Sequence, residues 1–396
     1  MKNKKIGFII FALVGILFSS FPTRVNAEEL GIEHRVKSYL IGSFEDGEIL
    51  NEYNSDEAMN MASVSKLMTY LVVKDSIEEG KISLEDKVTI DENIEAVEGS
   101  SFELKKGEEV SVNDLLKGLM VVSGNDAAYA LGVHTATTEE KFADLMNQKA
   151  KELGLKNAKF VNASGLQSEK GQNTLTTKEI FELARHIIKK YPEILDYSKI
   201  EVLNMPERNY TGYSTIPLVG EVAGVDGLKT GFTEEAGYCL VSTIDARKTP
   251  QRGEFRLITV VMGTSSMQER KDITKYLIDY ALENYSIRTI IDDKAPYTEI
   301  EINSAENKNI EIFPAKSYKT LASKSNKYVL KSNIDKEIKP PLKKGDKVGE
   351  LSLLKEDKLV TKVDLIVNRD VEKAGTFSRI LRAIQKFFTS LGNLLR

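Results

Sequence analysis

Three short strings in this chain carry side chains that could activate a serine without a histidine. They are Ser63-Val-Ser-Lys66, Ser123-Gly-Asn125 and Lys229-Thr-Gly231. A serine hydroxyl is a poor nucleophile until a neighbouring group accepts its proton. On the first turn of a helix, Ser63 and Lys66 would share one face, and burial beside other cations would lower the pKa of the lysine. The strings therefore predict nucleophilic catalysis by Ser63, with Lys66 as its base.

The surrounding sequence separates these strings from chance copies. A second S-x-x-K begins at Ser352 and a second S-x-N begins at Ser111. Ser352 lies among short alternating segments that are typical of strands, and Ser111 precedes an apolar run as a helix N-cap does. Ser63, in contrast, is followed by apolar residues at helical spacing. Lys229-Thr-Gly231 precedes a strand-like run, so its glycine would let a ligand approach an edge strand.

Together the strings resemble those of the serine-type D-alanyl-D-alanine carboxypeptidases, the low-molecular-mass penicillin-binding proteins. The likeness covers nearly everything after the first 27 residues. Supporting strings are Met61-Ala-Ser-Val-Ser-Lys-Leu-Met-Thr, Val122-Ser-Gly-Asn-Asp-Ala-Ala, Phe160-Val-Asn-Ala-Ser-Gly-Leu and Asp226-Gly-Leu-Lys-Thr-Gly-Phe-Thr. The chain has Asn162-Ala-Ser-Gly-Leu166 where the family more often has Asn-Pro-His-Gly-Leu. The family's usual Thr-Ala-Arg-Asp after that loop appears here as Leu175-Thr-Thr-Lys-Glu179. Both departures lie outside the catalytic strings and concern fine substrate preference.

The resemblance implies a catalytic role for each polar side chain of the first two strings. Ser63 would attack the carbonyl between the two terminal D-alanines of a peptidoglycan stem peptide and form an acyl-enzyme. Lys66 would take the serine proton, Ser123 would relay a proton to the leaving amine, and Asn125 would hold the backbone amide of the substrate. β-Lactam antibiotics would acylate the same serine.

The resemblance also implies which groups bind the substrate. Lys229 and Thr230 would hold the terminal carboxylate, with Arg270 as a second carboxylate-binding residue. The backbone N–H groups of Ser63 and Phe232 would form the oxyanion hole. We expect no cofactor and no metal ion.

Two alternatives stay open at this point. A class A-like β-lactamase shares the serine–lysine pair and K-T-G, and the pentad Glu169-Lys-Gly-Gln-Asn173 could supply its deacylating glutamate. However, the second string is S-G-N rather than S-D-N, and the C-terminal third is foreign to that class. A catalytically silent peptidoglycan-binding protein is the other alternative, which the intact serine and lysine strings oppose.

Composition narrows the function further. The 396 residues are too many for one typical core, so at least two domains are expected. The net charge is only −4 and no long basic block occurs, which disfavours nucleic-acid binding. The three histidines lack metal-ligand spacing, and Cys239 is the only cysteine, so no disulfide can form within the chain.

The N-terminus has the pattern of a secretory signal. Three lysines precede the apolar run Ile6 to Phe18, and the small-residue site Val25-Asn-Ala27 follows. We therefore expect a signal peptide over 1–27 and an enzyme that works outside the cytoplasm.

The order of apolar patterns predicts an α+β fold of the penicillin-binding/β-lactamase-like transpeptidase type over 28–286. An alternating run at 36–50 precedes helices over 63–190, and strands at 236–245 and 255–263 precede a closing helix near 267–285. One of the helices is expected to begin at a capping box, Thr137-x-x-Glu140.

Two further segments follow this domain. Short alternating stretches over 290–372 predict a small all-β domain, which we expect to act as a spacer or protein contact. Residues 376–396 keep apolar side chains at helical spacing, with basic residues among the polar positions. Such an amphipathic helix is expected to lie on the membrane surface, which would place the enzyme peripherally on the outer face of the cytoplasmic membrane. Docking of this helix on the β domain is the alternative.

Overall fold

The computed structural model describes residues 29–250, 253–376 and 384. The expected signal peptide over 1–27 lies outside the described residues, as does nearly all of the expected helix over 376–396. Within the described ranges, no helix combines the length and the apolar composition needed to cross a membrane.

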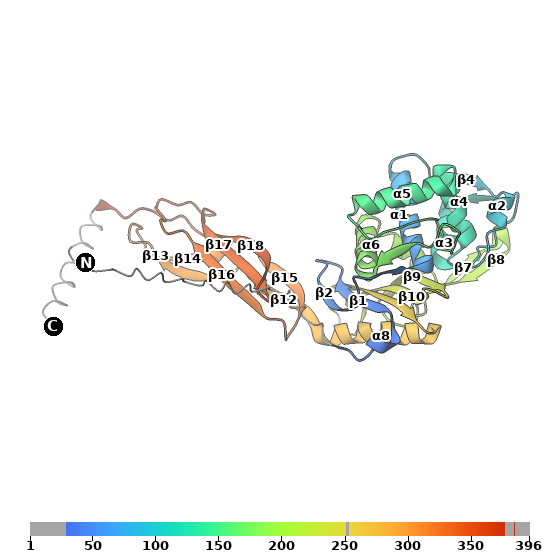
Figure 1. Cartoon of the computed structure of the whole chain (residues 1–396). Helices are drawn as coiled ribbons and strands as arrows, with labels where there is room; N and C mark the ends of the chain where they lie inside the picture. Colours follow the sequence, from blue (N-terminus) through green and yellow to red (C-terminus); the bar gives the residue numbers. More distant parts are fainter. Residues whose placement is uncertain (1–28, 251–252, 377–383, 385–396) are drawn as a thin grey trace, which may run out of the picture.

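A five-stranded antiparallel sheet forms the middle of the larger, N-terminal unit (Figure 1). Its order is β2 (Ile49–Tyr53), β1 (Ser38–Ser43), β11 (Arg256–Thr264), β10 (Gly237–Asp245) and β9 (Val225–Thr233). Strand β1 therefore pairs with β11, more than 200 residues further along the chain. The K-T-G string lies on β9, at an edge of the sheet.

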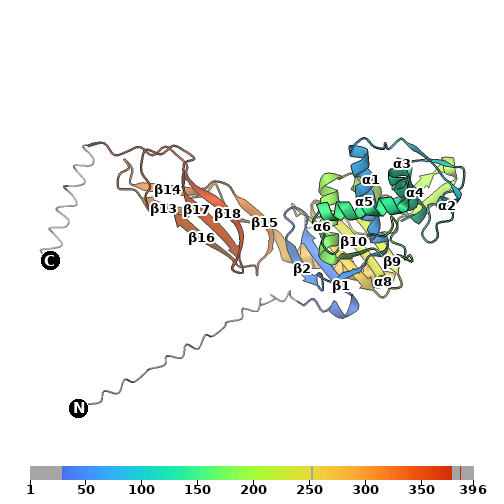
Figure 2. The same ribbon diagram turned by 45° about the horizontal axis from the view of Figure 1, so that its top comes forward.

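Both faces of the sheet are covered, because its side chains alternate between two cores. Leu40 packs into the core of the helical block, whereas Tyr39 and Ile41 pack into the core shared with α8 (Met267–Asn284). Figure 1 and Figure 2 show α8 on one side of the sheet and the helical block on the other. The helical block consists of α1 (Lys66–Glu78), α2 (Glu92–Glu95), α3 (Val112–Val121), α4 (Asn125–Ala136), α5 (Glu139–Glu152), α6 (Thr177–Lys190) and α7 (Ile194–Ser198).

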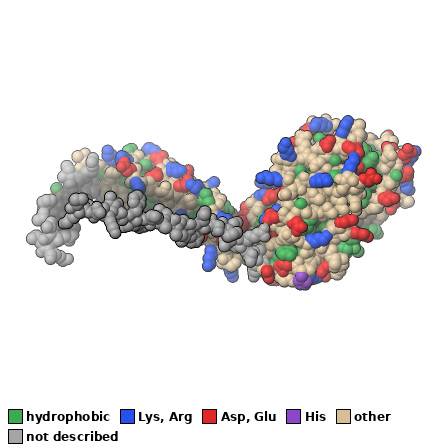
Figure 3. Space-filling model, in the orientation of Figure 1, with side chains coloured by type: hydrophobic (Ala, Val, Ile, Leu, Met, Phe, Trp, Pro, Cys, Tyr) green, Lys and Arg blue, Asp and Glu red, His purple; other side chains and the backbone are tan. Residues whose placement is uncertain are grey.

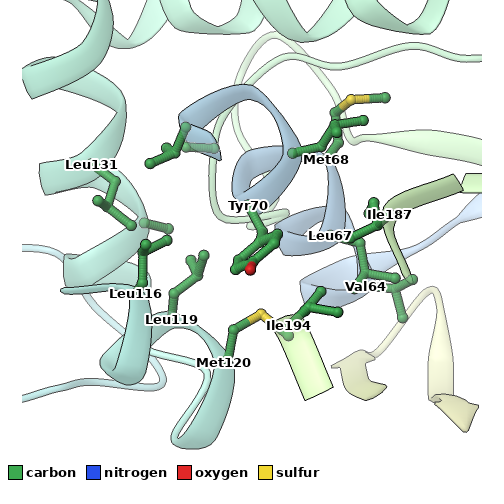
Figure 4. Packing of buried hydrophobic residues seen from close by; sticks show 14 of the residues in the cluster. Val64, Leu67, Met68, Tyr70, Leu116, Leu119, Met120, Leu131, Ile187 and Ile194 are labelled. Carbon is green, nitrogen blue, oxygen red and sulfur yellow. The ribbon is translucent and has the colours of Figure 1, made fainter. Parts of the chain in front are cut away.

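Helix α1 is the centre of the helical block. Every residue from Lys66 to Ser76 is buried, so the helix is enclosed on all sides rather than on one stripe. Figure 4 shows Tyr70 of α1 among apolar side chains that come from α3 and from neighbouring elements. The N-terminus of this rigidly packed helix carries Ser63 and Lys66, which fixes the position of the predicted nucleophile.

Short elements connect these layers. The remaining strands of this unit form three two-stranded antiparallel ribbons: β3 (Ala58–Asn60) with β6 (Thr174–Thr176), β4 (Lys87–Thr89) with β5 (Glu109–Ser111), and β7 (Val202–Met205) with β8 (Tyr210–Tyr213). The 3-10 helices are η1 (Glu33–Arg35), η2 (Ala62–Ser65), η3 (Pro206–Arg208) and η4 (Ala246–Lys248).

Helix caps test two of the sequence predictions. The Ser111 hydroxyl accepts a hydrogen bond from the Asp114 amide at 3.0 Å, so its assignment as the N-cap of α3 is confirmed. The prediction of a capping box at Thr137 is wrong by one residue. Thr138 caps α5, because its hydroxyl accepts from the Lys141 amide, while Thr137 ends α4 with a positive φ of 72°.

The C-terminal unit is β-rich. One sheet has the order β13 (Thr298–Glu301), β14 (Asn309–Pro314), β18 (Lys358–Val367), β17 (Lys347–Lys355) and β16 (Tyr328–Ile334). A second, two-stranded sheet pairs β12 (Tyr285–Ile291) with β15 (Tyr318–Ser323). The larger sheet encloses a hydrophobic core of its own. The expected order of an α+β unit followed by a β-rich unit is thus confirmed, whereas the exact domain limits stay a prediction.

The two units meet at the β1–β2 end of the central sheet. The Tyr285 hydroxyl donates to the Leu50 carbonyl at 2.8 Å, and the Thr320 hydroxyl donates to the Asp46 carboxylate at 2.7 Å. Leu321 of β15 joins the core that lies beneath α8. Beyond this junction the β-rich unit extends away from the helical block (Figures 1 and 2).

Candidate active site

Ser63 and Lys66 lie where η2 passes into α1. The Lys66 amine lies 2.8 Å from the Ser63 hydroxyl oxygen, as their spacing of three residues predicts. The amine is also 2.8 Å from the Asn125 side-chain oxygen and 2.8 Å from the Ser164 carbonyl oxygen. Lys66 is fully buried, while Ser63 is only half-buried. The Ser63 hydroxyl is therefore accessible to a ligand, while the neighbouring Lys66 amine is shielded from solvent.

Burial also changes the charge of Lys66. It lowers the pKa of the amine well below its usual range, since an ammonium ion loses its hydration there, and the positive charge of Lys229 lowers the pKa further. Asp126 acts in the opposite direction and raises the pKa. The net effect favours a neutral amine beside the serine.

Ser123 faces a second buried lysine across the cleft. It lies between α3 and α4 with a positive φ of 61°, and the Lys229 amine of β9 donates to its hydroxyl at 2.7 Å. Burial lowers the pKa of Lys229 to about 7, and the positive charge of Arg270 contributes to this shift. The K-T-G strand and the S-G-N turn are thus joined by one hydrogen bond.

Asn125 is held in a fixed orientation. Its side-chain nitrogen donates to the Glu98 carbonyl at 2.8 Å, which directs its side-chain oxygen toward Lys66. The next residue, Asp126, accepts from the Phe102 amide at 2.8 Å and from the Ser101 hydroxyl at 2.7 Å. These bonds tie the start of α4 to the preceding loop.

Strand β9 passes close to the nucleophile. A Cβ atom on Gly231 would lie 2.9 Å from the Met61 carbonyl oxygen and 3.2 Å from the Val64 amide nitrogen, so a larger residue would push the strand away from η2. Phe232 follows on the strand, with its side chain half exposed and stacked on Tyr238 at 4.2 Å between ring centroids. The close packing brings the backbone of this edge strand alongside the Ser63 turn.

Arg270 lies behind the K-T-G strand in the first turns of α8. It is buried, and its guanidinium donates weakly, at 3.4 Å, to the carbonyl of Cys239, the residue that pairs with Gly231. Its Nε atom is buried without a hydrogen-bond partner among the described residues. Cys239 itself is fully buried, and burial raises its pKa to about 11, so a thiolate nucleophile is disfavoured there.

Two contacts were not anticipated from the sequence. The Ser164 carbonyl accepts from Lys66, and the Thr230 hydroxyl lies 2.7 Å from the Thr215 hydroxyl. The string that contains Ser164 is among those that resemble the family. However, every residue has a backbone carbonyl, so the residue type does not indicate that this one contacts Lys66. Nothing in the pattern around Thr215 indicated its position.

The residues expected in a β-lactamase do not form such a site here. Glu169 is exposed. The buried Asn173 instead supports the loop before it, because its side chain accepts from the Val161 amide at 2.7 Å and donates to the Asn162 carbonyl at 2.9 Å. No group of side chains in the described ranges could hold a metal ion.

Comparison with known families gives this geometry its context. Residues 23–266 match the peptidase S11 family, described as D-alanyl-D-alanine carboxypeptidase. The chain belongs to this family. Residues 285–373 match a second family, the C-terminal domain of penicillin-binding protein 5. The protein is therefore a serine-type D-alanyl-D-alanine carboxypeptidase, as the resemblance of the three strings implied, and it has a β-rich C-terminal domain.

Individual relatives match either most of this carboxypeptidase or about three-fifths of it. It is 31% identical to D-alanyl-D-alanine carboxypeptidase DacF of Bacillus subtilis (strain 168), covering 94% of this chain and 96% of the relative. Penicillin-binding protein 5 from Haemophilus influenzae has a similar solved structure, with a TM-score of 0.67 and 27% identity, covering 85% of this chain and 98% of the other. Penicillin-binding protein D2 from Listeria monocytogenes, solved in its cefotaxime-bound form, has a TM-score of 0.56 and 32% identity over 62% of this chain and 96% of the other.

Proposed function

We propose that this carboxypeptidase removes the terminal D-alanine from peptidoglycan stem peptides through an acyl-enzyme on Ser63, with Lys66 as the general base. One observation carries the assignment of the base. The Lys66 amine has three oxygen neighbours at 2.8 Å, and two of them, the Asn125 side-chain oxygen and the Ser164 carbonyl, can only accept hydrogen bonds. A neutral amine has two N–H groups for these acceptors, which leaves its lone pair for the Ser63 proton.

The second lysine supports the departure of D-alanine. Because the Lys229 amine donates to the Ser123 oxygen, the Ser123 proton is free to point into the cleft. We assign Ser123 the role of passing its proton to the leaving amine. The proton that Lys66 takes from Ser63 would then replace the one that Ser123 has lost. Asn125 would hold the backbone amide of the substrate by a hydrogen bond, beside Lys66 and Ser123.

The terminal carboxylate would bind where positive charge is buried and no described carboxylate forms an ion pair with it. Lys229 and Arg270 supply the charge, and Thr230 supplies a hydroxyl donor. The backbone N–H groups of Ser63 and Phe232 would hold the oxyanion, which the close approach of β9 to η2 supports. Water would then release the shortened peptide, and β-lactams would acylate Ser63 in the same cleft.

We also propose that the enzyme is exported and held peripherally on the outer face of the cytoplasmic membrane. The signal-like segment 1–27 and the amphipathic pattern of 376–396 support this location. The β-rich domain would separate the catalytic domain from that surface.

The test uses a fluorescent penicillin together with mass spectrometry of a pentapeptide that ends in D-Ala-D-Ala. Ser63→Ala is expected to abolish both covalent labelling and D-alanine release. Ser352→Ala, which removes the serine of the second S-x-x-K string on β17, is the matched control and should behave as the parent does. Labelling that persists in Ser63→Ala would refute the assignment of the nucleophile.

A further inference from the structure

One residue contacts both walls of the catalytic cleft. Thr215 lies in the connection between β8 and β9, and its backbone N–H donates to the Val121 carbonyl at 3.2 Å. Val121 is the last residue of α3, two positions before Ser123. The Thr230 hydroxyl on the K-T-G strand donates to the Thr215 hydroxyl at 2.7 Å. Thr215 thus joins the helical wall to the sheet wall beside the proposed carboxylate subsite.

The pairing of two hydroxyls restricts what Thr230 can do. A hydroxyl group has a single proton to donate and two lone pairs. In this structure Thr230 donates to Thr215, so its proton is not available to a substrate carboxylate. If Thr215 donates to Thr230, the Thr230 proton is free to point toward the carboxylate. The described residues offer the Thr215 hydroxyl no hydrogen-bond partner apart from Thr230.

We propose that Thr215 is a positioning residue of the carboxylate subsite, and that its hydroxyl donates to Thr230 when substrate is bound so that Thr230 donates to the terminal carboxylate. Because Thr230 is the donor in this structure, substrate binding would have to reverse the two roles, which both hydroxyl groups can do by rotating. The reversed arrangement also polarises the Thr230 hydroxyl, since a chain of hydrogen bonds that ends on an anion strengthens each member. The proposal rests on the proposed role of Thr230 in binding the carboxylate.

A structural role for Thr215 makes a different prediction. The backbone bond to Val121 would hold the β8–β9 connection in place whatever side chain stands at position 215. Thr215→Val keeps that bond and the shape of the side chain but removes the hydroxyl. Thr215→Ser keeps a hydroxyl and should restore the effect. Thr211→Val, on the exposed face of β8, is a control for loss of a threonine hydroxyl outside the cleft.

The experiment compares a reactive thioester substrate in two forms, one with a free terminal carboxylate and one with a terminal amide. For the free acid, we expect Thr215→Val to raise KM about tenfold with little change in kcat, because a hydrogen bond to a charged group is weakened. For the amide, we expect no change. Thr215→Ser and Thr211→Val should match the parent on both substrates.

Two results would overturn the inference. One is an unchanged KM for the free acid in Thr215→Val, and the other is an equal loss on acid and amide, which would assign Thr215 a structural role alone. If Thr215→Val does not fold, Thr215→Ala is measured against the same two substrates and judged in the same way. Failure of the proposed function is separate, since in that case the parent enzyme would release no D-alanine from the pentapeptide that ends in D-Ala-D-Ala.

Discussion

The two buried lysines give acylation a pH dependence that tests their assigned roles. Lys66 must be neutral to accept the serine proton, and Lys229 must be charged to hold the carboxylate. The pKa of Lys66 lies well below its usual range through burial and the charge of Lys229, and the pKa of Lys229 is lowered to about 7 by burial and by Arg270. We expect kcat/KM for a D-Ala-D-Ala peptide to rise with pH as Lys66 loses its proton. Above about pH 7, kcat/KM should then fall as Lys229 loses its proton.

The size of the alkaline fall follows from the pKa of Lys229. At a pH about two units above its pKa, a group is only about 1% protonated. The kcat/KM near pH 9 should therefore be about one-hundredth of its maximum. The kcat profile reports the enzyme–substrate complex instead. There the bound carboxylate stabilises the ammonium form of Lys229, so the alkaline limb of kcat should lie at higher pH than that of kcat/KM.

The assay is the initial rate of D-alanine release between about pH 5 and pH 10, with folding checked at each pH. Arg270→Gln removes the neighbouring charge that helps to lower the pKa of Lys229, so its alkaline limb should move to higher pH even as carboxylate binding weakens. Arg247→Gln, which changes an exposed arginine, should leave the limb in place. A kcat/KM that stays level through pH 9, or a limb that does not move in Arg270→Gln, would refute this reasoning.

Three further predictions concern the rest of the chain. Gly165→Ala should lower the free energy of unfolding in urea by about 2–4 kcal/mol and slow penicillin acylation, because its φ is +84° and the new Cβ would lie 1.9 Å from the Ala62 carbonyl oxygen; Gly154→Ala, with φ of +72° and open space around it, should cost only about 1–2 kcal/mol and leave acylation unchanged. Glu169→Gln should not lengthen the lifetime of the penicilloyl-enzyme measured by mass spectrometry, whereas a strongly prolonged adduct would give Glu169 a deacylating role. Deletion of 377–396 should move the exported protein from the membrane to the soluble fraction without loss of activity on a small peptide, and a truncated protein that still sediments with membranes would contradict the proposed anchor.

The local part of the site could be predicted from the sequence because helix geometry turns spacing into distance. Two residues three apart at the start of a helix must be neighbours, and the Lys66 amine does contact the Ser63 hydroxyl. Local patterns also identified Ser111 as a helix cap, and the alternation of apolar residues identified the strand around Ser352. The cap prediction failed by one residue at Thr137, since the neighbouring Thr138 is an equally good cap residue and Thr137 ends α4 with a positive φ.

The contacts across the cleft could not be predicted in this way. Thr215 meets Thr230 only after the chain has turned back into β9, and Lys66 meets a backbone carbonyl nearly 100 residues away. No spacing rule applies at such separations. The resemblance to a known family assigned Ser123 and the K-T-G string to one site, but the hydrogen bond between Lys229 and Ser123 was not predicted.

The position of β1 has a consequence for how the enzyme folds. This strand lies inside the sheet, between β2 and β11, although it comes from the start of the described chain and β11 ends at Thr264. Its inner edge stays unpaired until β11 has been synthesised, and β9 joins the sheet only through β10, which itself pairs with β11. Pairing over such a separation has a large loop-closure entropy, which slows folding. A fragment that ends before β11 would thus contain every catalytic side chain of the three strings and still be unable to assemble the cleft.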